Sequence, residues 1–570
     1  MINSVHCFRR ETRGNVALIF GLAVIPVMTM VAAAIDYSSG SGKQAELRAN
    51  ADAAALVACR SSETDSAKLL AVAQSALNGM MPGETATIDA ATFTATNNPR
   101  SIEMTARMSQ STRFIKIANI RTMSLAANTK CAAGGGGTGG SGTTNAKNYE
   151  IALVLDTTGS MDYTAGGGKT KMQALREAAT SFVNTTFTKF GSEKLKISLV
   201  PFAATVNVGT ANAGAAWMDK TGLSSTHWDN LTGTRSGFTS RFDVFTKLKA
   251  KNADWAWGGC VEALPYTYST KDDRPVSTTG DSLYVPTFAP DEWGNSDIGT
   301  QSNLDNIDNN YMDDGTSSSG ACDNNGSDRL KRMGQACKYA DIKNARTSHP
   351  LGPNWQCTSR ALTPLTNDAT KLVGSTKAVD GKGGEIGELL AEGATNIHQG
   401  MHWGWRTISP NGVFTGPAAY SATNTTKIIV LMTDGVNQWR TNTKTESLTS
   451  IYSAYGYTKN MNGTSANSRL RSTDANPSDG DATRRAIDNL TRDTCTNARA
   501  KNILIYTVAF SVSGDTIDAD GQKLLMDCAG VTTTTNTGET KRSYLATDTA
   551  SLNKAFADIV TGIGELRITK

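Results

Sequence analysis

The sequence predicts an α/β fold with a doubly wound, mainly parallel sheet that carries large insertions. Between residues 148 and 565, apolar segments alternate with amphipathic segments of helical period. The apolar segments are continuous runs, which is typical of strands buried on both faces. Strands of this kind that alternate with helices form a parallel sheet covered by helices on both sides.

Seven segments carry this pattern. Strands are expected at 149–156, 194–203, 426–435 and 502–512, and helices at 171–187, 481–500 and 549–563. Two polar stretches, at about 210–385 and 437–480, break the alternation. Loops of such length without structure of their own are uncommon in compact domains, so we expect both to be insertions at the edge or rim of the sheet.

Tryptophans and cysteines indicate how the first insertion is held together. Five of its tryptophans predict either an internal core or an exposed binding patch: Trp217, Trp228, Trp255, Trp257 and Trp293. Six of the nine cysteines follow residue 147, and no CxxC pair occurs, which favours disulfides over a structural zinc site. Among the 15 possible pairings, we expect Cys495–Cys528 first, because these two positions flank one predicted strand.

The N-terminal region predicts a membrane anchor. Residues 16–35 contain no charge and have about the length that crosses a bilayer. Arginines precede them, and positive residues stay on the cytoplasmic side. We therefore expect a cytoplasmic segment at 1–14, a transmembrane helix at 15–36, and the rest of the chain outside the cytoplasm. A cleaved signal peptide ending at the alanines 32–34 and a buried core helix are the alternatives.

A small α+β module is expected over residues 37–131. Its first part is rich in Ala and Leu, which favour helices, and "SIEMTARMS" (101–109) alternates apolar and polar residues as a half-buried strand does. The run "GGGGTGGSGTTN" that follows has the composition of a flexible linker. We place this linker at 132–147.

A glycine-rich run after the first strand of the α/β region raises the question of phosphate binding. "GGGKT" (166–170) ends like a phosphate-binding loop, but Tyr163 stands where the first glycine of that motif belongs. We interpret the run as a turn before the helix. No hydrolytic triad or dinucleotide motif accompanies it, so we do not expect an enzyme. The net charge of +4, without a dense basic stripe, argues against nucleic-acid binding.

Oxygen-bearing side chains gather after two of the predicted strands. One strand ends in Asp156, followed by Thr158 and Ser160, and a later strand ends at Asp434. The carboxyl ends of parallel strands share one edge of the sheet, where ligands bind. Thr395 adds a hydroxyl at a predicted helix start. Because hard divalent cations prefer oxygen ligands, we predict that these five residues bind Mg²⁺, or Mn²⁺ or Ca²⁺ in its place.

This constellation resembles the metal-ion-dependent adhesion site (MIDAS) of the von Willebrand factor A (vWA) domain. The family pattern is Asp-x-Ser-x-Ser, a distant threonine and a later aspartate, and Thr158 replaces a serine while keeping the hydroxyl. The resemblance covers about 148–565 apart from the insertions and implies a Rossmann-like sheet. It also implies that the metal keeps one position open for a carboxylate of a partner protein. The alternative is a hydrogen-bonded turn without an ion.

Other segments resemble TadG-like proteins of the tight-adherence (Flp) pilus-assembly system. They are the apolar N-terminal segment followed by "ELRANADAAALVA", together with "WGGCVEA" (257–263), "LTPLTND" (362–368) and "MHWGWRTISP" (401–410). The resemblance implies that residues 37–131 form a TadG/TadE-like, pilin-like module. Pseudopilins of this system are cut after a glycine with Glu five residues on. Here Ile19 follows Gly14 at that distance, so we expect an uncleaved anchor.

Together, these resemblances predict a single-pass, extracytoplasmic pilus-assembly or adhesion protein of the bacterial cell envelope. Its partners would be proteins that supply a carboxylate, such as pilus or secretion-system components. Two alternatives stay open: a surface adhesin that binds host or matrix ligands directly, and a non-catalytic subunit of a metal-chelatase-like enzyme.

Two weaker signals favour structural readings. His398 and His402 could share a helix face as zinc ligands, but Gln399 stands where zinc proteases have a glutamate, so we expect packed or surface histidines. The acidic stretch 305–315 lacks the spacing of an EF-hand, and we expect a solvated loop.

Overall fold

The computed structural model describes residues 15–61, 63–97, 100–112, 114, 116, 119–133, 147–231, 237–292, 309–312, 333–340, 352–375, 382–441, 448, 450–459, 467–538 and 541–565. The chain forms two compact units, residues 1–145 with 565–570 and residues 146–564. The predicted cytoplasmic segment, Trp293, and most of the predicted linker and acidic loop lie outside the described residues.

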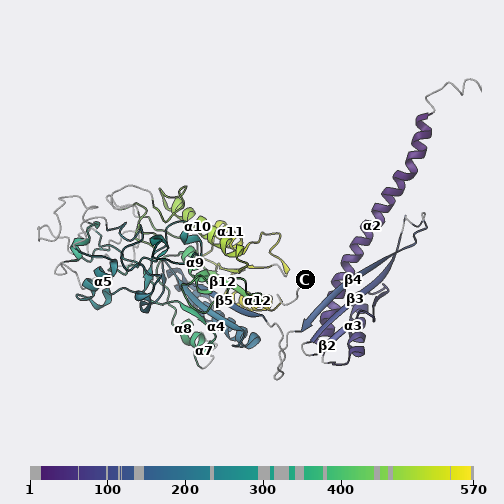
Figure 1. Ribbon diagram of the computed structural model, residues 1–570, viewed down its shortest axis with the longest axis horizontal. Coiled ribbons are helices and arrows are strands. Elements are labelled where there is room, and N and C mark those ends of the chain that lie inside the picture. Colours follow the sequence, from purple (N-terminus) through teal and green to yellow (C-terminus); the bar gives the residue numbers. More distant parts are fainter. Residues whose placement is uncertain are drawn as a thin grey trace, which may run out of the picture. The chain divides into compact units, whose positions relative to one another are not determined.

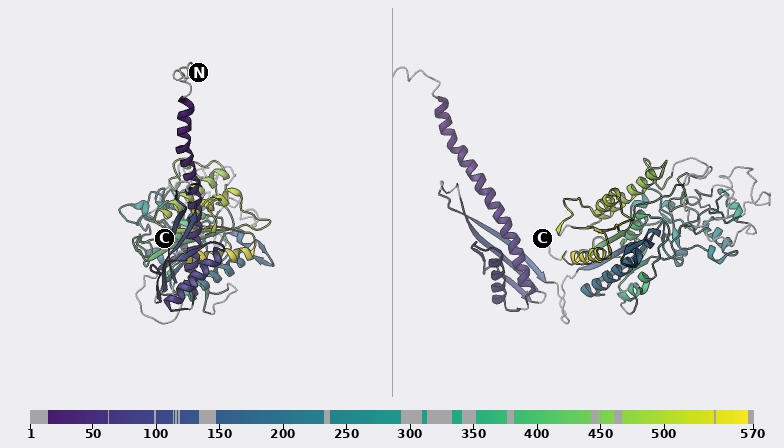
Figure 2. Two further views of the ribbon diagram at one scale, coloured as in Figure 1. Left: turned by 90° about the vertical axis from the view of Figure 1, so that its right-hand side faces the viewer. Right: turned by 180° about the vertical axis from the view of Figure 1, so that it is seen from behind.

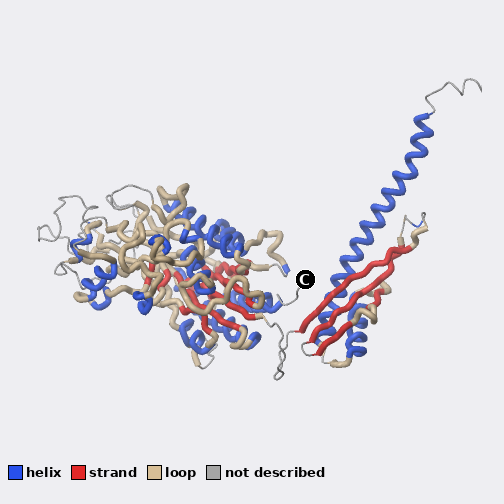
Figure 3. The backbone as a smooth tube through the Cα atoms, in the orientation of Figure 1, coloured by secondary structure: helices blue, strands red, loops and turns tan. Residues whose placement is uncertain are grey.

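The first unit is an α+β module. Helices α2 (Asn15–Arg60) and α3 (Ser66–Met80) accompany an antiparallel sheet of β1 (Ala86–Ile88), β2 (Thr94–Asn97), β3 (Arg100–Ser111) and β4 (Thr122–Ala133). The sheet packs along the C-terminal part of α2, and the N-terminal part of the helix extends beyond it (Figures 2 and 3). A disulfide between Cys59 and Cys131 ties the end of α2 to β4.

The helix α2 contains the predicted transmembrane segment. Among the helices of the described residues, none is both long and apolar enough to cross a membrane. Most side chains between residues 15 and 32 lie outside the described set.

The second unit is built on a six-stranded sheet that is mostly parallel, as the sequence predicts. Its order is β11-β8-β5-β12-β13-β14, with β5 (Asn148–Asp156), β8 (Leu195–Phe202), β11 (Thr363–Thr366), β12 (Thr425–Thr433), β13 (Leu504–Phe510) and β14 (Ser543–Ala546). Only the edge strand β11 is antiparallel to its neighbour. It falls within the predicted first insertion. The sequence did not predict this strand, because its four residues are too few and too polar to stand out.

Helices cover both faces of this sheet (Figure 1). The helices α4 (Lys171–Phe190), α7 (Ala369–Val373), α8 (Gly384–Gly387) and α12 (Thr549–Glu565) lie on one side, and α9 (Ile397–Ile408), α10 (Gly480–Ala500) and α11 (Ala519–Ala529) on the other. Alternate residues of β5 belong to the two cores: Leu153 faces α4 and α12, and Val154 faces α9. This is the doubly wound arrangement predicted for continuous apolar strands.

Two glycines bring α9 close to the sheet. A Cβ on Gly400 would lie 2.7 Å from the ring of Phe202, and one on Gly404 would lie 2.4 Å from Cγ2 of Val154. Distances this short leave no room for a side chain, so the helix backbone itself packs on the strands. The N-terminus of α9 is thereby fixed at the edge of the sheet where β5 and β12 end.

The first insertion packs as an extension of the core. Four of its tryptophans are at most 7% exposed and belong to the same apolar cluster as α9, which confirms the core interpretation for them: Trp217, Trp228, Trp255 and Trp257. The insertion also contains α5 (Arg241–Lys249) and β10 (Cys260–Val261), which pairs with β9 (Val206–Asn207) just before the insertion. Disulfides link Cys260 to Cys357 and, as expected, Cys495 to Cys528.

Candidate functional site

The five predicted metal ligands lie on three loops at one edge of the sheet. The strands β5 and β12 are parallel neighbours, with Leu155 opposite Met432 in register. Asp156 and Asp434 therefore reach the same edge, as the sequence predicts for adjacent strands. Thr395 lies just before α9, on the third loop.

Four of these side chains form a continuous hydrogen-bonded chain. Asp156 Oδ1 accepts from the Thr158 hydroxyl at 2.6 Å, and the Thr158 and Ser160 hydroxyls lie 3.1 Å apart. The Ser160 hydroxyl donates to Asp434 Oδ1 at 2.9 Å. The other Asp156 oxygen accepts from the hydroxyl of Thr433 at 2.5 Å. The chain joins two carboxylates through two hydroxyls.

The spacing of these oxygens matches the ligand shell of a small divalent cation. In an octahedron with metal–oxygen distances of about 2.1 Å, neighbouring ligands lie about 3.0 Å apart. The three oxygen–oxygen distances along the chain from Asp156 to Asp434 are 2.6, 3.1 and 2.9 Å. The donor set therefore fits Mg²⁺ in chemistry, and its spacing, which is also that of ordinary hydrogen bonds, is compatible with such a shell.

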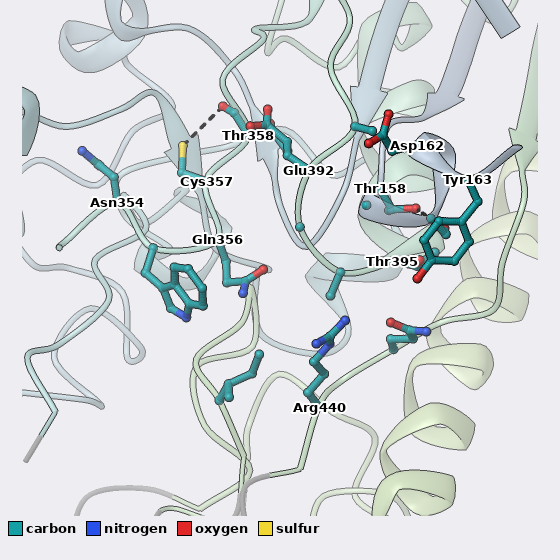
Figure 4. Close-up of a pocket in the computed structure, with 18 of the residues that line it drawn as sticks. Thr158, Asp162, Tyr163, Asn354, Gln356, Cys357, Thr358, Glu392, Thr395 and Arg440 are labelled. Atoms are coloured by element: carbon teal, nitrogen blue, oxygen red, sulfur yellow. Dashed lines mark hydrogen bonds between the residues drawn. The ribbon is translucent and has the colours of Figure 1, made fainter. Parts of the chain in front are cut away.

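Backbone hydrogen bonds hold the three loops together. The N–H groups of Gly159 and Glu392 bond to the carbonyls of Gly393 and Thr157, at 3.0 and 2.8 Å. The carbonyl of Thr395 accepts from the N–H of Gln438 at 2.8 Å. The Thr395 side chain is buried and lines the same pocket as Thr158 and Ser160 (Figure 4). Three of the five predicted ligands thus line one pocket, and Asp156 and Asp434 are not among its described lining residues.

The electrostatics of the site favour a bound cation. Burial, as the largest cause, and the negative charge of Asp434 together raise the pKa of Asp156 to about 7, although hydrogen bonds from Thr158 and Thr433 act in the opposite direction. Burial also raises the pKa of Asp434, although its ion pair with Lys171 acts in the opposite direction. Two carboxylates buried side by side resist joint ionisation. A divalent cation between them would remove that cost.

Two charged residues at this edge were not predicted from the sequence. Lys171 is fully buried, donates to Asp434 Oδ2 at 2.8 Å and also forms an ion pair with Asp515. Asp515 lies in a short turn after β13. It reaches this edge only because β5, β12 and β13 are neighbours in the folded sheet. Lys171 carries no recognisable signal, because a lysine at a helix start usually points to solvent.

The "GGGKT" run is a turn, as interpreted from the sequence. It connects the short strands β6 (Thr164–Gly166) and β7 (Lys169–Thr170), and all three of its glycines have positive φ. Thr170 then caps α4 in a reciprocal pair with Gln173. This turn places Lys171 at the first position of α4, from where it reaches Asp434.

A cavity of about 1240 Å³ opens above the predicted ligands, and we call it the groove. Its floor is the loop around Thr158 and Ser160. Its walls come from residues 252–255 and 354–358 of the first insertion, from the loop before α9, and from residues that follow β12 (Figure 4). The insertions therefore shape the space in front of the site.

The two histidines of α9 are packed in the core. The Nε2 of His398 donates to the Ser269 carbonyl at 3.0 Å, and its Nδ1 lies 2.8 Å from the hydroxyl of Tyr455. The Nε2 of His402 lies 2.6 Å from the hydroxyl of Tyr284. Both rings are buried, and burial lowers the pKa of His398 to about 4 and that of His402 well below its usual value.

The low pKa of His398 predicts acid sensitivity. Because the fold favours the neutral ring, the unfolded chain binds more protons between pH about 4 and about 6.5. The free energy of unfolding should therefore fall as the pH drops through this window, by up to about 1.4 kcal/mol per pH unit from this group. The variant His398→Gln should show a shallower dependence in chemical unfolding between pH 5 and 7. Equal slopes in both proteins would contradict the assignment.

Comparisons with known proteins give one family match. Residues 14–74 match the family of putative Flp pilus-assembly TadE/G-like proteins. This match agrees with the resemblance of the N-terminal region stated from the sequence. A comparison with curated protein sequences finds no match.

Several solved structures of pilus proteins are similar to the chain at low scores. They include the pilus adhesin SpaC from Lactobacillus rhamnosus GG (10% identity, 83% of this chain and 34% of that one, TM-score 0.31). Others are the PilB minor pilin from Streptococcus sanguinis (13%, 84% and 78%, 0.29) and the adhesive tip pilin GBS104 from Group B Streptococcus agalactiae (11%, 73% and 100%, 0.31). The chain spans about a third of the length of SpaC. Scores this low do not establish a shared fold.

Proposed function

We propose that the second unit is a vWA domain whose MIDAS binds Mg²⁺ through Asp156, Thr158, Ser160, Thr395 and Asp434. The observation that carries the proposal is the hydrogen-bonded chain from Asp156 to Asp434, whose oxygen spacing fits an octahedral shell. Mn²⁺ and Ca²⁺ are the alternative ions. The bound metal supplies an open coordination position that accepts a carboxylate oxygen from a partner protein.

The protein acts by binding rather than by catalysis. Its site, as proposed, needs neither a nucleophile nor a general base. The match of residues 14–74 to TadE/G-like proteins supports a role in assembling or anchoring a pilus at the bacterial cell envelope. The uncharged segment 16–35 supports a single N-terminal membrane span, with the metal site outside the cytoplasm. Pilus or secretion-system components are the partners that fit this location.

The test is capture of partners from the native envelope by the full-length protein, in the presence of Mg²⁺ and again with a chelator. We expect pilus or secretion-system components to be retained with Mg²⁺ and released by the chelator. Retention that does not depend on Mg²⁺ contradicts the metal-bridged mechanism. Retention of host or matrix molecules instead favours a surface adhesin. A location of the domain in the cytoplasm favours a chelatase-type subunit.

A further inference from the structure

The β3–β4 turn of the first unit lies beside α2, at the point where the helix passes beyond the sheet (Figures 2 and 3). The N–H of Phe114 in this turn donates to the Asp36 carboxylate of α2 at 2.8 Å. Just below the turn, the side chain of Gln110 donates to the Ser39 hydroxyl at 3.0 Å. These hydrogen bonds hold the turn against one level of the helix.

Asp36 marks the level at which the proposed membrane span ends. It is the first charged residue after the uncharged segment 16–35. A carboxylate is costly in the hydrocarbon core, so the helix leaves the core at about this residue. Because Phe114 is hydrogen-bonded to Asp36, the β3–β4 turn lies at the height of the membrane surface when segment 16–35 crosses the bilayer.

Large apolar side chains are exposed around this contact. They are Ile35 (48% exposed) and Tyr37 (72%) on α2, and Phe114 (43%) and Ile120 (53%) in the turn. None of the four belongs to the apolar cluster that forms the core of the first unit. Exposed apolar residues that gather at one place mark an interaction surface, whereas single ones are common on any protein.

Basic side chains accompany the apolar ones. Lys116 and Arg121 are exposed in the turn, and residues 112–121 include no acidic residue. Lysine and arginine can lay their apolar stems along a membrane surface while their charged ends reach the lipid phosphates. Aromatic and aliphatic side chains flanked by basic residues are typical of segments that lie in the membrane interface.

We propose that the β3–β4 turn is a second membrane contact, which inserts Phe114 and Ile120 into the interface of the extracytoplasmic leaflet. This inference rests on the proposed function only in that it needs the N-terminal membrane span. Lys116 and Arg121 bind the phosphates of anionic lipids, and Tyr37 lies at the same level on α2. The contact sets how the first unit stands on the membrane, since interfacial anchors fix the tilt and rotation of a spanning helix.

A lipid surface fits this patch better than a protein partner does. The patch continues the uncharged segment of α2 and lies where aromatic rings gather at bilayer surfaces. The adjoining open face of the sheet is polar, and its charges pair with each other: Arg107 with Asp89 at 3.2 Å and Lys130 with Glu103 at 3.1 Å. The exposed apolar surface therefore ends with the turn, whereas a stable protein interface is broader.

The test measures lipid contact with the full-length protein, one molecule per nanodisc of phosphatidylcholine and phosphatidylglycerol. In a Cys7→Ser background, Ile120→Cys or Asn128→Cys carries an environment-sensitive fluorophore, and spin-labelled lipids quench it. Asn128 is exposed and lies about 20 Å along β4 from the turn. We expect quenching at position 120 to exceed that at position 128 at least about threefold.

Two results would overturn the proposal. One is quenching at position 120 as weak as at position 128. The other is a fluorophore at position 120 that is shielded from water but not quenched by lipid, which would indicate contact with protein instead.

Removing the proposed contact residues tests whether they, rather than the fluorophore, carry the insertion. The triple variant Phe114→Ser, Lys116→Gln, Arg121→Gln should lower quenching at position 120 to the level at position 128. Lys130→Gln removes an exposed charge elsewhere on β4 and, as the matched control, should leave quenching unchanged. Equal quenching of the triple variant and the unsubstituted turn would show that the fluorophore inserts by itself, and the proposal would be wrong.

A fluorophore on Phe20→Cys distinguishes failure of this inference from failure of the proposed membrane span. Phe20 lies in the uncharged segment and is 69% exposed. If lipid does not quench this position, the membrane span and the turn inference both fail. If lipid quenches position 20 but not position 120, only the turn inference fails.

Discussion

Replacing Asp156 with alanine is expected to weaken Mg²⁺ binding by more than about 100-fold. Loss of groups that merely orient a ligand costs 10–100-fold, and Asp156 is one of only two carboxylates among the five predicted ligands. Titration calorimetry of the wild type should show binding, and the variant should show none. Saturating Mg²⁺ should also stabilise the wild type, by about 2.7 kcal/mol at 100 times the dissociation constant, and leave Asp156→Ala unchanged.

The exposed Asp162 provides a matched control for this experiment. It lies on the same loop and lines the groove, but its carboxylate is not part of the chain from Asp156 to Asp434. Asp162→Ala should bind Mg²⁺ within a few-fold of the wild type. If Asp156→Ala binds Mg²⁺ as the wild type does, the ligand assignment is wrong. If the wild type binds no divalent cation, these residues form only a hydrogen-bonded turn.

Replacing Lys171 with methionine is expected to destabilise the metal-free protein by about 3–5 kcal/mol. The change removes the buried partner of Asp434 and leaves an uncompensated charge. It should also increase the stabilisation by Mg²⁺ beyond that of the wild type. Without the Lys171 ammonium, the carboxylates of Asp156, Asp434 and Asp515 attract the metal, and no neighbouring cation opposes metal binding. Chemical unfolding of both proteins with and without saturating Mg²⁺ measures the two effects.

Lys169→Met is the control for the change at Lys171. The Lys169 ammonium pairs with Glu177 on the surface, where its side chain is 43% exposed. A pair of this kind contributes at most about 1 kcal/mol, and its loss should not alter the response to Mg²⁺. If Lys171→Met abolishes Mg²⁺ binding, then Lys171 is needed to orient Asp434, and its role as a compensating charge is wrong.

The main strands and the helices α4, α10 and α12 could be predicted from the sequence because their signal is local, whereas α7, α8 and α11 were not predicted. Continuous apolar runs and amphipathic segments follow from which faces are buried. The short strands β11 and β14 escaped detection, because four residues carry too little periodicity to separate a strand from a loop. Their place in the sheet depends on pairing, of β11 with β8 and of β14 with β13. The partners in each pair are far apart in the chain or are joined by an irregular connection.

The candidate site was likewise predicted only in part from the sequence. Asp156, Thr158 and Ser160 stand together in the sequence, and Asp434 ends a recognisable strand, so their meeting followed from parallel strand order. Lys171 did not follow, because nothing in the sequence indicates that its side chain turns inward. Asp515, Gln356 and Arg440 likewise come to the site only through the turns and insertions that surround it.

The sequence by itself determined the class of fold and the side chains at the ends of β5 and β12, whereas the pairing of Cys495 with Cys528 was one expectation among 15 possibilities until the structure showed it. These depend on short-range patterns and on strand order, which any chain of this type must satisfy. The tertiary structure alone decided the charge balance at Asp434 and the shape of the groove. Both depend on contacts between segments far apart in the chain, whose distances are set by how the insertions pack.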